Sequence, residues 1–456
     1  MRFSARLSAL TDKASLPPGL NNAYLFALFN ALSFQVVLSS PMVLYAKSLH
    51  ASATVLGIIT GMMPLLVIFQ IPAASYIGRV GYKRFVFAGW GTRVTFIFGM
   101  ALVPLTGRFL NEGSRLGLIL ALLFGFNLSR GISSCAWLPW ISALVPAEVR
   151  GTYLARDAAC VNLASFLSLF LAAFGLGSSP QAWQFAMLFA FSAIMGAISL
   201  TFLKRIPDRP STEEAGGSKG PVPWGAMLRF PPFQKLLYMV VAWSLAYGGI
   251  TAFSVVFLKS GVGMPEGRIL LLSSVSYLGG LWSLWFLGSR VDGLGSKPVL
   301  TFSFALWVMV LLGWMALAGS AVKPGAAIIL ALQLLMGLFA ALIAMSNTRL
   351  AMAVVPAMGR NHFFALYSVI TNVALGLAPI GWGIVIDAIG EHEAMALGLS
   401  WNRFSVFFAA VALVMLAALF FARRLEEPKA ASLEVLLREI LIQSPQRVLV
   451  RLWPRE

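Results

Sequence analysis

Long apolar stretches alternate with short polar segments along almost the whole chain. A helix needs about 20 mostly apolar residues to cross a bilayer, and twelve stretches of this sequence meet that condition. They cover residues 22–46, 54–78, 85–105, 116–141, 155–177, 181–203, 234–258, 268–288, 298–318, 325–348, 363–388 and 402–422. Six of them precede the stretch 204–233, whose Pro, Gly, Ser and charged residues are typical of a flexible linker. The pattern predicts an all-α membrane protein with twelve transmembrane helices.

The second half of the sequence repeats motifs of the first at a nearly constant distance. A Val-Pro-Ala tripeptide followed by Arg150 and Asn162 recurs 210 residues later, followed by Arg360 and Asn372. Upstream, the segment 79–83 aligns with 293–297 at an offset of 214. We interpret the chain as two pseudo-symmetric six-helix bundles, 1–203 and 234–424, joined by the linker 204–233 and followed by a tail, 425–456. Duplicated apolar halves are typical of secondary transporters, which bind solute between the halves.

Composition supports a membrane protein and argues against a nucleic-acid-binding one. The chain is 59% hydrophobic and 11% charged, whereas soluble domains carry about 25% charged residues. In a soluble protein, a net charge of +17 would favour binding of nucleic acid. Here most basic residues lie in short loops and tails. Cys135 and Cys160 lie within apolar stretches and fit neither a disulfide framework nor a metal site.

The distribution of basic residues predicts the orientation of the helices. Of the 34 Lys and Arg residues, 25 lie in the tails and in the loops on the same side as the tails, and seven lie in the opposite loops. Basic residues favour the cytoplasmic side, so both termini are predicted to be cytoplasmic in a multi-pass protein of a bacterial inner membrane. In the tail 425–456, leucines at helical spacing beside Arg438 predict an amphipathic helix, which either lies on the inner leaflet or packs against cytoplasmic loops.

Six plus six spans with a central polar segment resemble the major facilitator superfamily. That family carries a Gly-x-x-x-Asp-Arg-x-Gly-Arg-Lys/Arg motif after spans two and eight. The second half matches it at Gly288, Asp292, Gly295 and Lys297, and the first half at Arg79, Gly81, Lys83 and Arg84, with Gly78 where the family has Asp. The resemblance covers about residues 20 to 425 and implies the twelve-helix fold, a small-molecule substrate and alternating access.

The loop motif and the repeated arginines are candidate gating residues. A carboxylate can cap a helix N-terminus or pair with an arginine, and we hypothesise that Asp292 latches the start of span five through Arg150 or Arg156. The alternative is a solvated loop charge. The full predicted gating set is Arg79, Lys83, Arg150, Asp292, Lys297 and Arg360.

Two spans carry polar stripes at helical spacing, which predict solute contacts. Span four has Asn127, Arg130, Ser134 and Trp137 on one face, and span seven has Ser244, Tyr247, Thr251 and Ser254. In the family that the chain resembles, spans one, four, seven and ten line the central cavity, which adds Gln35 and Gln333 as candidates. The alternative for each uncharged residue is a helix–helix hydrogen bond, worth about 0.6 kcal/mol.

The two arginines within spans, Arg93 and Arg130, lead to the most specific predictions. An arginine at the centre of a span costs about 2.5–3.5 kcal/mol, so Arg130 should face a cavity or a partner. An anionic group on the solute would satisfy it, and backbone carbonyls or a buried Asn are the alternative. Arg93 lies nearer the end of its span, and we expect its long side chain to reach the cytoplasmic headgroups.

The sequence predicts a carrier and not an enzyme. It has no Ser/His/Asp set, phosphate-binding Gly loop or His/Cys metal spacing, so we expect no cofactor and no metal. Asp157 and Asp387 lie near span ends, which leaves both proton coupling and facilitated diffusion open. Arg130 favours an anionic solute, and the aromatic residues beside it permit an amphipathic one. The alternatives are a transporter-derived membrane assembly factor or sensor without transport activity, and a channel.

Overall fold

A computed structural model describes residues 19–74, 76–145, 150–208, 224–287, 295–354, 360–396 and 398–425, together with Glu427, Glu434 and Leu436. Within these ranges the chain is almost entirely helical. Eleven helical segments are long and apolar enough to cross a membrane, and they coincide with eleven of the twelve predicted spans. The eighth predicted span coincides with a helix of 22 residues, α14 (Glu266–Leu287). The fold class predicted from the hydropathy pattern is therefore confirmed.

The helices group into two compact units that do not follow the sequence halves strictly. Unit 1 is drawn from Met1–Lys219 and Ala252–Ser274, and unit 2 from Gly220–Thr251 and Val275–Glu456. The segment 252–274, which the sequence analysis assigns to the second bundle, therefore packs with the first. The bundle limits 1–203 and 234–424 themselves stay a prediction.

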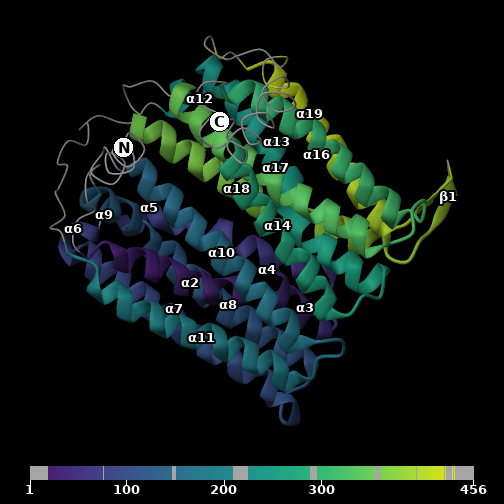
Figure 1. Cartoon of the computed structure of the whole chain (residues 1–456), viewed down its shortest axis with the longest axis horizontal. Coiled ribbons are helices and arrows are strands. Elements are labelled where there is room, and N and C mark those ends of the chain that lie inside the picture. The colour runs from purple at the N-terminus through teal and green to yellow at the C-terminus, as the bar shows by residue number, and fades with distance from the viewer. Residues whose placement is uncertain are drawn as a thin grey trace, which may run out of the picture. The chain divides into compact units, whose positions relative to one another are not determined.

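The first half of the chain, coloured from purple to teal in Figure 1, contributes most of unit 1. In chain order its elements are α2 (Asn21–Leu38), α3 (Ser40–Ser48), α4 (Ala53–Leu65), η1 (Leu66–Phe69), α5 (Gln70–Ala74), α6 (Ile77–Val80), α7 (Tyr82–Leu102), η2 (Val103–Arg108), α8 (Glu112–Ser134), α9 (Trp137–Leu144), α10 (Arg150–Leu176) and α11 (Ala182–Arg205).

The second half begins with a short helix and ends with a span that follows a small hairpin. Its elements are α12 (Trp224–Leu228), α13 (Pro231–Val256), η4 (Phe257–Gly261), α14, α16 (Ser296–Ala318), α17 (Ala326–Val354), α18 (Arg360–Ile389), β1 (Ala394–Ala396), β2 (Leu399–Trp401) and α19 (Arg403–Arg423).

Three features depart from the sequence-based expectations. The predicted linker 204–233 contains the end of α11, the whole of α12 and the start of α13. The loop between the last two spans forms an antiparallel hairpin in which Ala394 pairs with Trp401, and Gly398 takes a φ of +74° in its turn, which glycine adopts readily. The predicted amphipathic helix of the tail lies largely outside the described residues.

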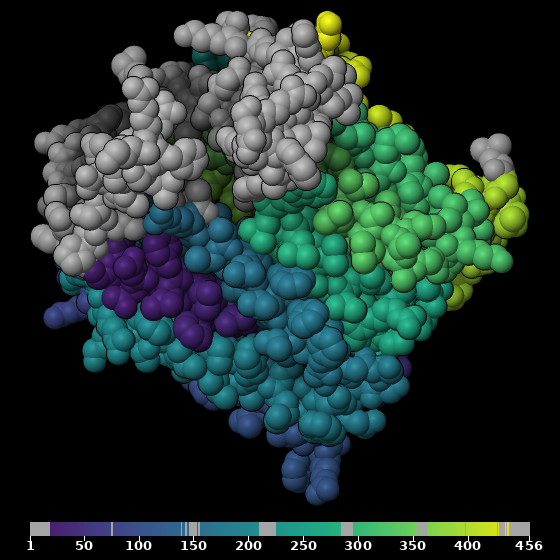
Figure 2. All heavy atoms as spheres, in the orientation of Figure 1, coloured from purple at the N-terminus to yellow at the C-terminus, as the bar shows by residue number. Residues whose placement is uncertain are grey.

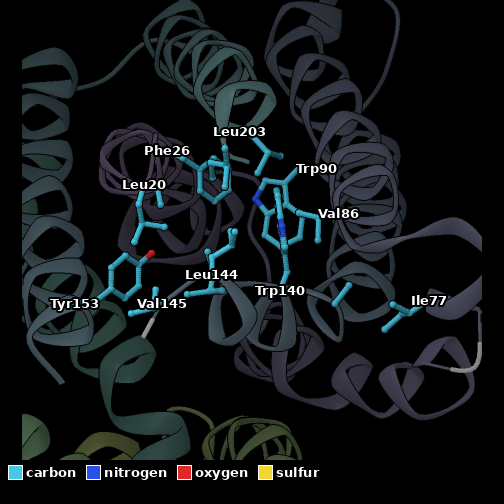
Figure 3. Close-up of a cluster of buried hydrophobic side chains, with 14 residues drawn as sticks. Leu20, Phe26, Ile77, Val86, Trp90, Trp140, Leu144, Val145, Tyr153 and Leu203 are labelled. Atoms are coloured by element: carbon cyan, nitrogen blue, oxygen red, sulfur yellow. The ribbon is translucent and has the colours of Figure 1, made fainter. Parts of the chain in front are cut away.

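In unit 1, helix α2 packs against α10 and α11, and α7 packs against both α8 and α11. In the space-filling view the purple atoms of α2 are flanked by the blue and teal atoms of α10 and α11 (Figure 2). At one end of these helices, a cluster of buried apolar side chains includes Phe26, Trp90, Trp140 and Tyr153 (Figure 3). The packing of these aromatic rings against one another holds one end of these helices together.

Glycines let α7 and α8 approach closely. A Cβ atom on Gly89 would lie 2.1 Å from the Cβ of Ser133, and one on Gly125 would lie 2.4 Å from the Cζ of Phe96. The Ser129 hydroxyl donates a hydrogen bond to the Gly89 carbonyl at 2.9 Å. Small residues are the usual means by which membrane helices pack without a hydrophobic driving force. This crossing determines which side chains of α7 and α8 contact each other beyond Gly89.

The repeat of the sequence is visible in the backbone. Gly81 precedes α7 with φ 84° and ψ 151°, and Gly295 precedes α16 with φ 87° and ψ 162°. These two glycines are equivalent in the 214-residue offset, and the conformation is one that residues with a Cβ rarely adopt. Asn162 and Asn372, equivalent at 210, each donate to the carbonyl four residues earlier. The two halves thus share local structure as well as sequence.

In unit 2, helix α16 packs against α17 and α19, and glycines bring α14 and α17 together. A Cβ on Gly337 would lie 1.7 Å from the carbonyl oxygen of Ser276, and one on Gly279 would lie 2.1 Å from that of Leu334.

Two indole N–H groups of unit 2 donate hydrogen bonds to atoms of other helices. Trp314 Nε1 donates to the sulfur of Met336 at 3.1 Å, and Trp382 Nε1 donates to the Leu245 carbonyl at 2.7 Å.

Candidate functional site

The polar face of α8 forms a buried layer in unit 1. Asn127 is 1% exposed, and its Nδ2 donates to the Leu123 carbonyl at 3.0 Å. Its Oδ1 is buried and has no hydrogen-bond partner among the described residues. Arg130 follows one turn later and is half-buried. This helix therefore carries an unpaired acceptor and a cation inside a membrane-spanning segment.

Arg93 lies beside that layer, and not at the headgroups. It is 4% exposed, with its guanidinium carbon 4.7 Å from the centre of the Trp90 ring and 4.9 Å from that of Phe126. The expectation that this side chain reaches the cytoplasmic surface is therefore wrong. The physical reason is the close α7–α8 crossing at Gly89, which turns this face of α7 toward α8.

Ser134 and Trp137 are engaged in contacts within unit 1. Ser134 accepts a hydrogen bond from Gln70 Nε2 at 2.6 Å, which joins α8 to α5. Trp137 packs in the aromatic cluster, 4.9 Å from Phe26 and 6.1 Å from Trp90 between ring centres. These are the structural alternatives to solute contact, and α8 ends at Ser134, so Trp137 begins the next helix. On α2, Gln35 is 4% exposed.

The corresponding candidates of unit 2 lie on α13 and α17. Tyr247 stacks on Trp243 with ring centres 4.8 Å apart and an angle of 20° between the planes. Trp307 lies 5.7 Å from Trp243. Gln333 is buried on α17, with 4% of its surface exposed, whereas Thr251 is exposed. The structure thus joins Tyr247 to an aromatic cluster and leaves Thr251 accessible.

The predicted gating residues are only partly visible. Arg79 is exposed on α6, and Lys83 is half-buried in the first turn of α7. Arg150 and Arg360 begin α10 and α18. Asp292 lies outside the described residues, so the latch hypothesis stays a prediction.

Sequence analysis missed a carboxylate at the start of α16. The backbone N–H groups of Ser296 and Lys297 donate to Glu427 Oε2 at 2.9 and 2.8 Å, and Ser296 also donates to Oε1 at 3.1 Å. A carboxylate at a helix N-terminus satisfies otherwise unpaired N–H groups and interacts favourably with the helix dipole. Glu427 follows the last span, so the contact ties the end of α19 to α16. The sequence signal is an acidic residue just beyond a span in an otherwise basic segment.

Replacing Glu427 by Gln should lower the stability of the protein. The variant loses the charge at the N-terminus of α16 and part of its hydrogen bonding. The free energy of unfolding should fall by about 1 kcal/mol. The midpoint of thermal unfolding in detergent should fall, and the matched change Glu393→Gln, at an exposed position, should leave it in place. Equal midpoints for the two variants would show that the cap contributes nothing.

Acidic groups of the interior lie near the ends of the spans. Asp157 is half-buried near the start of α10, and its Oδ1 has no hydrogen-bond partner in the described part of the chain. Burial raises the pKa of the nearby Tyr153 phenol, and the charge of Asp157 adds to this effect. Glu266, 6% exposed, pairs with Lys259 at 2.5 Å. Among the described residues, no group of three or more His, Cys, Asp or Glu has the arrangement of a metal site.

Comparison with known proteins gives a single consistent result. A family model described as the Major Facilitator Superfamily matches residues 23–289. No curated protein matches the sequence. Among solved structures, a D-xylose-proton symporter is similar with a TM-score of 0.71 and 13% identity, covering 92% of this chain and 100% of its own. A mutant of the nucleoside transporter NupG has a TM-score of 0.68 and 12% identity, with 90% and 100% covered. The inward-open xylose transporter XylE from E. coli has a TM-score of 0.66 and 14% identity, and the match covers 91% of this chain and 97% of XylE.

Proposed function

Because this chain belongs to the major facilitator superfamily, we propose that it carries a small solute across a membrane by alternating access. The observation that carries the proposal is the buried polar layer of α8. An unpaired amide oxygen on Asn127 and the cation of Arg130 are unfavourable in a span that only packs against lipid and other helices. A hydrophilic solute supplies the partners that these groups lack. The similar solved proteins are described as xylose and nucleoside transporters, which supports a solute of this size.

The proposed solute contacts begin with the polar groups of α8, Asn127 and Arg130. On α13 they are Tyr247, which offers a ring face and a hydroxyl, and Thr251, which lies one turn further along and is exposed. Gln35 and Gln333 complete the proposed set of solute contacts because of their positions on α2 and α17. Ser134 and Trp137 hold neighbouring elements, and we assign them supporting roles.

We further propose that the loop residues Arg79, Lys83 and Lys297, with Arg150, Asp292 and Arg360, control opening on the cytoplasmic side. A basic loop next to a helix start can pair with carboxylates in one conformation and release them in another. Proton coupling is a separate question. One similar structure is described as a proton symporter, and Asp157, which is half-buried, and Asp387 are the carboxylates that we propose as carriers.

Uptake into proteoliposomes tests the proposal. A panel of labelled sugars, nucleosides, carboxylates and organic phosphates is offered to the reconstituted full-length protein, and at least one should accumulate faster than in protein-free liposomes. Tyr247→Ala should raise the KM for that solute several-fold because the ring face is lost. Tyr238→Ala is the matched control on the same helix, since Tyr238 is 54% exposed and packs on Phe421.

Two results would contradict the proposal. The first is that no class of solute enters faster than in protein-free liposomes although the protein is folded, which would favour a sensor or assembly factor derived from a transporter. The second is that the two tyrosine variants change KM equally, which would remove Tyr247 from the site.

A further inference from the structure

Two arginines in adjacent spans of unit 1 lie at the same depth. Arg93 lies 11 residues after the first residue of α7, Tyr82, and Arg130 lies 11 residues before the end of its span at Ile141. At about 1.5 Å per residue, each lies roughly 16 Å from the same end of its span, close to the middle of a bilayer core about 30 Å thick. The Arg93 guanidinium contacts the ring of Phe126, which lies one helical turn before Arg130 on α8. Two cations therefore share one layer of the membrane interior.

The helix crossing fixes this pairing. Gly89 lies one turn before Arg93 and would clash with Ser133 if it carried a Cβ, at 2.1 Å. The Ser129 hydroxyl donates to the Gly89 carbonyl at 2.9 Å, and Phe126, one turn earlier on α8, covers the Arg93 guanidinium at 4.9 Å. Arg93 is thus held beside the segment of α8 that carries Arg130.

Neither arginine has an anionic partner in the described part of the chain. Arg93 Nε is fully buried without a hydrogen-bond acceptor, and the side chain is 4% exposed. Its ring contacts with Trp90 and Phe126 stabilise a cation, but they do not neutralise it. The ion pairs of His50, Lys259 and Arg403 with nearby glutamates involve neither of these two arginines. The layer thus carries an excess of positive charge where the low dielectric makes repulsion strong.

We propose that Arg93 and Arg130 form an oxyanion site that binds the carboxylate or phosphate group of the transported solute. This inference rests on the proposed transport function and narrows its substrate to an anion. A guanidinium binds carboxylate and phosphate through paired N–H groups, and one oxyanion near both arginines would relieve their mutual repulsion. Trp90 and Phe126 keep Arg93 in place before the anion arrives. Arg130, for which the described residues show no such ring contact, completes the site.

Thermal unfolding of the purified full-length protein tests the site without requiring transport. The probes are inorganic phosphate and acetate alone, followed by matched pairs: a hexose phosphate with its hexose, and a dicarboxylate with its diamide. An anion that binds the folded state should raise the unfolding midpoint, and its neutral counterpart should do so much less. Comparing phosphates with carboxylates tells which oxyanion the site prefers.

Variants assign the effect to the two arginines. Arg93→Gln and Arg130→Gln should each weaken anion binding at least tenfold, while Arg130→Lys should retain part of it. Arg108→Gln is the matched control, because Arg108 is exposed in the same unit. Without ligand, Arg130→Gln should unfold at no lower temperature than the wild type, since it removes an unpaired interior cation. If Arg93→Gln does not fold, Arg93→Lys keeps the charge without the planar fork and should likewise retain only part of the anion affinity.

The inference is overturned if no anion stabilises the protein, if neutral and anionic partners protect equally, or if Arg130→Gln keeps the wild-type response. Anion-dependent stabilisation that is lost in Arg130→Gln supports it even if proteoliposomes show no uptake, and in that case it is the transport function that fails. Uptake of a neutral solute with no anion effect would keep the transport function and remove the oxyanion site.

Discussion

Replacing Gly267 by Leu should abolish solute exchange by the reconstituted protein while leaving it folded. The N–H of Gly267 donates to the Gly177 carbonyl at 2.7 Å, and both residues belong to unit 1. A Cβ on Gly267 would lie 2.5 Å from the Ala173 carbonyl oxygen and 2.7 Å from that of Gly177. The start of α14 then cannot rest against the end of α10. We expect the exchange rate per folded molecule to fall at least tenfold.

The reason for so large an effect is that this contact holds the start of α14, which comes from the second half of the sequence, within unit 1. The distribution of basic residues predicts that these helix ends lie on the side opposite the termini. A carrier that exposes its site to alternate sides needs each unit to keep its packing through the cycle, so a unit 1 in which the start of α14 cannot dock on α10 should not complete it. Gly175→Leu is the control, because a Cβ atom there would meet nothing within 4 Å. Near wild-type exchange by the Gly267 variant would show that this contact plays no part in the cycle.

The largest effect on stability is expected for Gly337→Ala. A Cβ at this position would lie 1.7 Å from the Ser276 carbonyl oxygen, so the backbones of α14 and α17 must separate. Overpacking of this kind costs about 3 kcal/mol, or more where two helices have to shift. The unfolding midpoint should fall sharply, or folded protein should be lost from the membrane fraction. Gly381→Ala is the matched control, since its Cβ would meet nothing within 4 Å. Equal unfolding midpoints for the two variants would contradict the close approach of α14 and α17.

Hydropathy and the repeat predicted the fold because both depend on residue type alone. A span is recognisable from about 20 apolar residues whatever it packs against. The equivalent glycines Gly81 and Gly295 take the same backbone conformation because only glycine adopts it readily. Neither inference requires knowing which helices are neighbours.

The site was harder to predict because it depends on packing. The position of Arg93 along α7 suggested a side chain that reaches the headgroups, but the close contact of Gly89 with Ser133 determines where its side chain lies. Helical spacing predicted that Ser134 and Trp137 share a face with Arg130, yet in the structure Gln70 and an aromatic cluster contact them. Glu427 caps a helix 131 residues earlier in the sequence, and no local pattern reports such a contact.

Counterflow tests the central claim most directly. Proteoliposomes are loaded with an unlabelled solute that stabilises the protein, and a trace of the same solute in labelled form is added outside. A carrier that works by alternating access exchanges the two, so labelled solute should rise inside above its external concentration and then decline. A channel would bring it only to the external concentration, and a sensor would not admit it. Failure to exceed the external concentration, with folded protein that still binds the solute, would contradict the account.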